Sequence, residues 1–141
     1  MRSERMKFLM SENNPFDAVV TAIPISGEFL TEVGEGMDDI WEVVLNRGST
    51  DGWAVGNQVI LFALGPNIVD PLSEEDLGHF EIVRGRGRVT HVQQKMCTVR
   101  SSRTVAKSVQ NALLALGEDR FVERPAPFAT VHIGDFARLI G

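Results

Sequence analysis

The sequence contains no tyrosine, a single cysteine, and no lysine between Lys7 and Lys95. One cysteine, Cys97, cannot form an internal disulfide, so the fold does not depend on oxidation. No apolar run approaches the roughly 20 residues that a membrane-spanning helix needs. The apolar run within residues 1–10 covers only about five residues, which is too short for the core of a secretory signal. We therefore expect a cytoplasmic protein with no membrane span.

The missing lysines also decide how the glycine-rich stretch at residues 46–65 is interpreted. A phosphate-binding loop needs a lysine and then a serine or threonine after its last glycine, at the start of a helix. Here Gly56 is followed by Asn57 and an apolar run, and Asp51-Gly52 is a turn signal. These glycines are therefore interpreted as turns between strands, and we expect no cofactor.

Short β-branched segments between turn residues predict a mainly β protein. Strands are expected at 17–25, 29–33, 40–46, 57–64, 79–85, 88–101 and on either side of the Gly134-Asp135 turn. Residues 65–78 are expected to form a polar loop, and the two glycines of the 84–88 stretch to mark a bulge or bend. Together these features predict a small, mostly antiparallel β-barrel of about six strands with one packed α-helix, spanning residues 15–141 after a flexible tail at 1–14.

The helix is expected near residues 103–116. Its apolar residues recur at i, i+4, i+7, i+8 and i+11, and they are Val105, Val109, Ala112, Leu113 and Leu116. This spacing is typical of one apolar helix face packed on a sheet.

The last strand is expected at residues 136–140, covering an edge that would otherwise stay open. In this interpretation Leu139 points into the core and Arg138 points outward.

Charge is distributed unevenly along the chain. Residues 1–81 hold 15 acidic and 4 basic side chains, whereas residues 82–117 hold 7 basic and no acidic ones. The basic segment either complements the acidic half of the same molecule or forms a surface for an acidic partner or nucleic acid. The candidate binding residues are Arg84, Arg86, Arg88, Lys95 and Arg100. On a regular strand Arg84, Arg86 and Arg88 alternate by two and would be exposed on the same side.

No complete catalytic set is found in the sequence. The three histidines, His79, His91 and His132, lack metal-ligand spacing, and we expect no metal site. Cys97 and His91 could form a nucleophile–base pair only if residues 93–95 made a hairpin. We interpret Cys97 as a small buried apolar residue and expect a protein that is not an enzyme.

Four phrases of the sequence occur in an order that resembles the C-terminal domain of flagellar assembly protein T and related bacterial accessory modules. The matching residues are Asp51, Gly52, Val55, Gly56, Val59, Ile68, Val69, Asp70, Pro71, Leu77, Gly78, Gly134 and Asp135. Trp53 and Asn57 stand where that pattern usually has valine and aspartate. The resemblance covers roughly residues 16–141, implies a small β-barrel, and supplies no catalytic residues.

These observations predict a non-catalytic protein-interaction or assembly accessory module. Its expected partner is a protein, with self-association as one form of that contact. The alternative is a nucleic-acid-binding barrel that uses the basic 84–107 segment.

Overall fold

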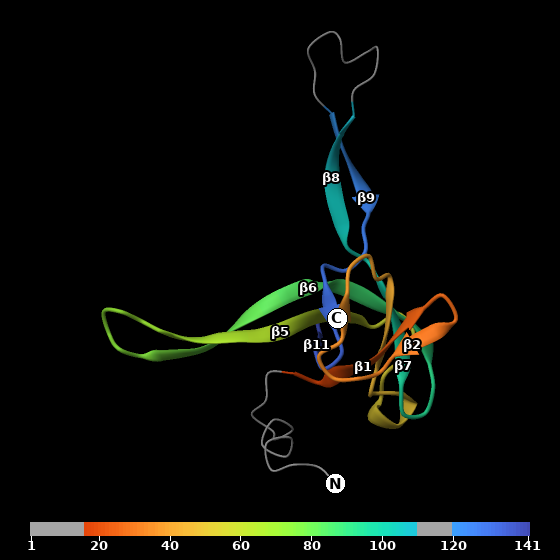
Figure 1. The fold of residues 1–141 in the computed structure, drawn as a ribbon, viewed down its shortest axis with the longest axis horizontal. Coiled ribbons are helices and arrows are strands. Elements are labelled where there is room, and N and C mark those ends of the chain that lie inside the picture. The colour runs from red at the N-terminus through yellow and green to blue at the C-terminus, as the bar shows by residue number, and fades with distance from the viewer. Residues whose placement is uncertain (1–15, 110–119) are drawn as a thin grey trace.

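The computed structural model describes residues 16–109 and 120–141, and the chain is mainly β-strand (Figure 1). The expected tail at residues 1–14 lies outside these described residues. The strands are β1 (Ala18–Ile25), β2 (Glu28–Leu30), β3 (Gly36–Met37), β4 (Glu42–Leu45), β5 (Gln58–Val69), β6 (Asp76–Val92), β7 (Cys97–Ser101), β8 (Thr104–Val109), β9 (Arg120–Pro125), β10 (Val131–His132) and β11 (Phe136–Leu139). One 3-10 turn, η1 (Ser49–Asp51), precedes β5. All strand pairs are antiparallel, so the prediction of a mainly β, antiparallel protein is confirmed.

The central sheet has the order β11-β5-β6-β7-β4-β1-β2. In addition β1 pairs with β11, so that Ala18 lies opposite Ala137 and Val19 lies opposite Phe136. The pairings therefore run in a closed cycle from β1 through β4, β7, β6, β5 and β11 back to β1. This closure covers backbone groups of β1 and β11 that would otherwise form an open edge.

The core lies on one face of these strands, because apolar residues alternate with more polar ones along them. Its strand residues are Ala18, Val20, Ile23, Val43, Leu45, Val59, Leu61, Val89, Cys97, Val99, Val131 and Ala137. Ile40, Trp53, Phe128 and Ile133, which lie outside the strands, complete the same cluster. The predicted burial of Cys97 as a small apolar residue is thus confirmed.

Two β-hairpins extend from this body (Figure 1). β11 reaches only Phe62 of β5, and β7 reaches only Gly87 of β6. Beyond these points β5 and β6 pair only with each other, as a ribbon that we call the β5–β6 arm. The second ribbon, formed by β8 and β9, is called the β8–β9 arm.

The prediction of a polar loop at residues 65–78 is wrong for most of these residues. β5 continues to Val69 and β6 begins at Asp76, so only the short turn between them is a loop. Pro66 suggested a break because proline cannot donate a ladder hydrogen bond. It falls in an irregular stretch between the Leu64 and Asn67 pairs, where the ladder is already interrupted.

The prediction of an α-helix near residues 103–116 is wrong for the part of it that the structure describes. Residues 104–109 form β8, and the part from residue 110 onward lies outside the described residues. There is no α-helix in the described ranges 16–109 and 120–141. The periodicity of a short apolar segment does not separate helix from strand. Here pairing with β9, which runs from Thr104 opposite Pro125 to Val109 opposite Arg120, gives a strand.

The bulge expected at the paired glycines is confirmed. Leu61 lies opposite Gly85 while Phe62 lies opposite Val83, which leaves Arg84 as the extra residue. Gly85 has a φ of +141°, a conformation that residues with a side chain rarely adopt. Gly87 has a different role, because a Cβ atom there would lie 2.4 Å from Val99 Cγ1.

The prediction that residues 136–140 pair with an earlier strand is confirmed for β11, which pairs with both β5 and β1. The predicted burial of Leu139 is wrong. Ala137 is fully buried between Ala18 and Leu61, whereas Leu139 lies beyond the pairing with β1 and is 38% exposed.

Arg138 connects β11 to the root of the β5–β6 arm. Its Nη1 and Nη2 atoms each donate a 2.9 Å hydrogen bond to the Glu81 carboxylate. These hydrogen bonds and the positive charge of Arg138 hold the pKa of Glu81 below its usual range. The guanidinium also lies 4.9 Å from the centre of the Phe62 ring. The arm is therefore fixed to the body by a bidentate ion pair as well as by its strands.

Candidate functional site

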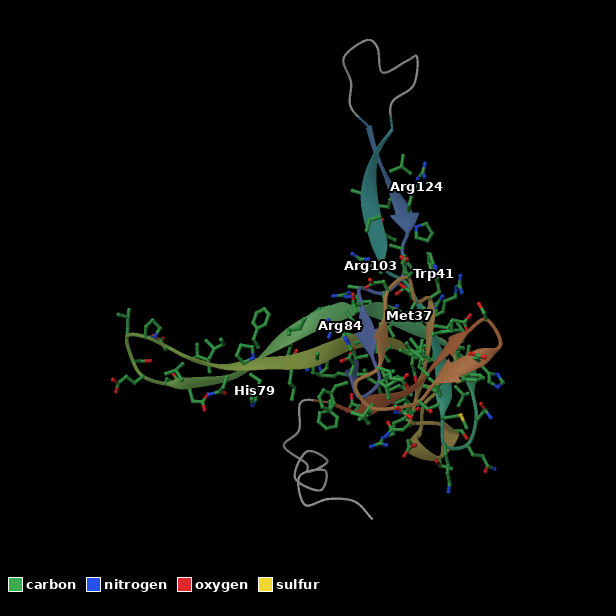
Figure 2. All side chains as sticks on the ribbon, viewed as in Figure 1. Met37, Trp41, His79, Arg84, Arg103 and Arg124 are labelled. Carbon is green, nitrogen blue, oxygen red and sulfur yellow. The ribbon has the colours of Figure 1, made fainter. Side chains whose placement is uncertain are left out.

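A pocket of about 490 Å³ lies where the two arms leave the body. Its charged lining consists of three arginines, which are Arg84, Arg86 and Arg103. Ile60 and Val83 add apolar surface. Figure 2 shows Arg84 and Arg103 at this junction, below the β8–β9 arm. We call this feature the arginine pocket.

Arg84 is fixed in the pocket wall by the β-bulge and by Asp135. The Arg84 Nε atom lies 3.1 Å from Asp135 Oδ2, and the two side chains are 17% and 6% exposed. The same carboxylate oxygen accepts a 2.8 Å hydrogen bond from the His132 backbone N–H. Arg84 Nη2 is also 3.3 Å from His132 Nδ1. Arg84 thus has a structural partner and lies apart from the exposed side that the sequence predicted for it.

Arg103 is held by the chain segment that follows β9. Its Nη1 atom donates a 3.0 Å hydrogen bond to the carbonyl of Pro127, and its own carbonyl accepts one from the Ala126 N–H. The neighbouring Ser102 N–H donates to the carbonyl of Arg86, which brings the roots of the two arms together. Among the described residues neither Arg86 nor Arg103 forms an ion pair. These two charges are therefore available to an anionic group.

Of the other predicted binding residues, Arg86 lines the pocket, whereas Arg88, Lys95 and Arg100 lie outside it. Arg86 and Arg88 are exposed on β6, and Arg88 lies directly opposite Arg100 of β7. Arg100 is 3.3 Å from a Glu42 carboxylate oxygen, and its guanidinium lies 5.3 Å from the centre of the Trp41 ring. Like charges that face each other across a ladder repel. The structure thus brings Arg86, Arg88 and Arg100 together as a basic row.

Lys95 does not join this row, because it lies in the turn between β6 and β7. Two residues of this site were not predicted: Arg103, which lines the pocket, and Asp135, which pairs with Arg84. Arg103 belongs to the basic segment at residues 82–117, but the apolar spacing that follows it predicts the start of a helix there. Asp135 was recognised only as a turn residue, and nothing in the sequence indicates its contact with Arg84, 51 residues earlier.

The hairpin at residues 93–95 does form, but it does not create a nucleophile–base pair. Cys97 lies opposite Val92, and His91 lies opposite Thr98. Adjacent positions of a ladder face opposite sides of the sheet, so Cys97 is buried while His91 is exposed. Burial raises the pKa of the Cys97 thiol to about 11, which keeps it protonated near neutral pH.

In residues 16–109 and 120–141, no three His, Cys, Asp or Glu side chains are grouped so that they could hold a metal ion. No helix in the same part of the chain is long and apolar enough to cross a membrane.

Comparison with protein families, with curated proteins and with solved structures found no match for this chain.

Proposed function

We propose that this protein is a non-catalytic interaction or assembly accessory module, a small barrel whose arms contact a protein partner. The observation that carries the proposal is the apolar surface of the β5–β6 arm. Its exposed apolar side chains are Ile68, Val69, Leu72, Leu77, Phe80, Ile82 and Val83. Leu72 in the turn is 95% exposed. Exposed apolar side chains gathered on one arm are typical of a site that another protein covers.

Two further points support this proposal. The cyclic strand pairing fits a small barrel, which is a rigid body from which an arm can be presented. The resemblance to the C-terminal domain of flagellar assembly protein T also favours an accessory role. It bears on fold more than on pathway, because one fold carries many functions.

The proposal is tested by removing the apolar surface of the arm. We expect the triple variant Leu72→Ser, Leu77→Ser and Phe80→Ser to lose partner capture from extracts of the source organism at an unchanged melting temperature. The matched control replaces three exposed apolar residues of the body, Phe29, Val33 and Val55, by serine. This control should capture the partner as the wild type does. Equal capture by the arm variant and the wild type would contradict the proposal.

A nucleic-acid-binding function is the second candidate, and the basic row favours it. Arg88 and Arg100 face each other across the ladder beside Arg86, an arrangement that a bound phosphate would stabilise. Fluorescence anisotropy with labelled single-stranded and duplex oligonucleotides tests this candidate. Binding should weaken steeply with salt and fall about tenfold or more in the double variant Arg86→Ser and Arg88→Ser. The absence of binding at low salt would eliminate it.

A further inference from the structure

The turn at the end of the β5–β6 arm is both acidic and apolar. We call residues 70–76 the acidic tip, because Asp70, Glu74, Glu75 and Asp76 lie in the same turn as the exposed side chain of Leu72. Asp70 Oδ1 accepts hydrogen bonds from the Leu72 and Ser73 backbone N–H groups, at 2.8 and 3.3 Å. These two bonds lower the pKa of Asp70, so its carboxylate is charged at neutral pH. The tip therefore presents an exposed apolar side chain together with several negative charges.

The arginine pocket at the other end of the same arm has the complementary character. Arg86 and Arg103 supply positive charge, and Ile60 and Val83 supply apolar surface. A guanidinium recognises a carboxylate through two parallel hydrogen bonds, which gives geometric selectivity as well as attraction. We propose that the acidic tip of one molecule docks in the arginine pocket of a second copy of this chain. This inference rests on the proposed function, since it names the partner of the β5–β6 arm.

The tip cannot reach the pocket of its own molecule. Val83, which lines the pocket, and Asp76, where the tip ends, are seven positions apart on β6. At about 3.3 Å per residue an extended strand separates them by about 23 Å. The pairing of β5 with β6 holds the intervening residues extended. Docking therefore takes place between molecules.

The positions of the tip and the pocket limit the assemblies that can form. Each chain carries one tip and one pocket at opposite ends of the arm, so the contact joins two different surfaces. A single contact of this kind leaves one tip and one pocket unused and continues to a ring or an open filament, whereas two molecules with antiparallel arms can exchange tips and close a two-fold dimer. Because the contact pairs carboxylates with arginines, it should weaken as salt is added.

The experiment uses two variants that each remove one half of the contact. The tip variant carries Leu72→Ser, Glu74→Ser and Glu75→Ser, and the pocket variant carries Arg86→Ser and Arg103→Ser. Arg84 is left unchanged because it pairs with Asp135. The matched control for the tip variant is Glu28→Ser, Glu32→Ser and Val33→Ser, which removes the same kinds of side chain from the body. Circular dichroism melting checks that each variant is folded.

Sedimentation equilibrium then measures mass against protein concentration and salt. We expect the wild type and the control to associate as the concentration rises, and each variant alone to associate at least tenfold more weakly. An equimolar mixture of the two folded variants should form a one-to-one dimer and stop there, because it holds one intact tip and one intact pocket. Dimers in the mixture but not in either variant alone would establish the head-to-tail contact.

Three results would overturn the inference. They are a wild type that stays monomeric at every concentration, variants that associate as the wild type does, and a mixture that remains monomeric. The capture experiment tests the proposed function separately. A monomeric wild type that still captures another protein through Leu72, Leu77 and Phe80 leaves that function standing and removes only self-assembly. A monomeric wild type that captures nothing removes both.

Discussion

Replacing Phe128 by alanine is expected to lower the free energy of unfolding by about 4 kcal/mol. The ring is 2% exposed and lies against both glycines of the bulge, because a Cβ atom built on Gly85 or Gly87 would be 3.2 or 3.0 Å from it. The missing side chains of those glycines leave space into which the Phe128 ring packs. Val99 also lies beside Gly87, and Arg103 lies beside Gly85. Loss of the Phe128 ring creates a cavity beside the arginine pocket, which Gly85 also lines. Urea denaturation monitored by circular dichroism measures the effect.

The matched control for this substitution is Phe29→Ala. Phe29 lies on β2 and its side chain is largely exposed, so its replacement should change stability by no more than about 0.5 kcal/mol. Equal losses in the two variants would show that Phe128 does not fill a tightly packed site.

The substitution Asp135→Ala is expected to lower the free energy of unfolding by about 3 kcal/mol. It leaves the largely buried Arg84 charge without its partner, and it removes the acceptor of the His132 N–H. Breaking a buried ion pair from one side is costly, because the remaining charge has already lost its contact with water. The comparison is Glu42→Ala, which breaks the exposed pair with Arg100 and should cost less than about 1 kcal/mol.

Chemical denaturation of the two variants gives the comparison directly. Asp135→Asn refines the test, since the amide oxygen can still accept the His132 N–H while the charge is lost. If Asp135→Ala lowers the free energy of unfolding only as much as Glu42→Ala does, the Arg84–Asp135 pair does not stabilise the fold.

The mainly β class and most strand positions could be predicted from the sequence, because alternation and turn residues are local signals. Gly85 and Gly87 indicated the bulge for the same reason. The strand at Thr104–Val109 could not be predicted, since its partner strand begins at Arg120 and pairing rather than local periodicity decides its structure. Ala137 and Leu139 share one face of β11, but Ala137 is buried under the pairing with β1 whereas Leu139 lies beyond it. The sequence does not show where that pairing ends.

Only part of the candidate site could be predicted from the sequence. The count of charges located the basic segment, and Arg86 and Arg88 are exposed there as expected. The bulge shifted Arg84 out of the alternation and toward Asp135, which no spacing rule along β6 could reveal. The arginine pocket exists because the chain returns from β9 to hold Arg103 through Pro127, and such long-range contacts leave no local pattern.

The two strands of the β5–β6 arm pass from one environment to another within a single ladder. Near Val59 and Gly87 they are flanked by β11 and β7, whereas near Ile68 and Gly78 water borders both edges. A two-stranded ribbon is marginally stable by itself, and the free energy of local opening falls where few apolar contacts are buried. Amide protons on one strand therefore exchange with solvent at rates that rise steadily toward the turn. The two strands of the arm can separate at their far end while the body stays folded. A partner bound at that end therefore controls how long the two strands stay paired.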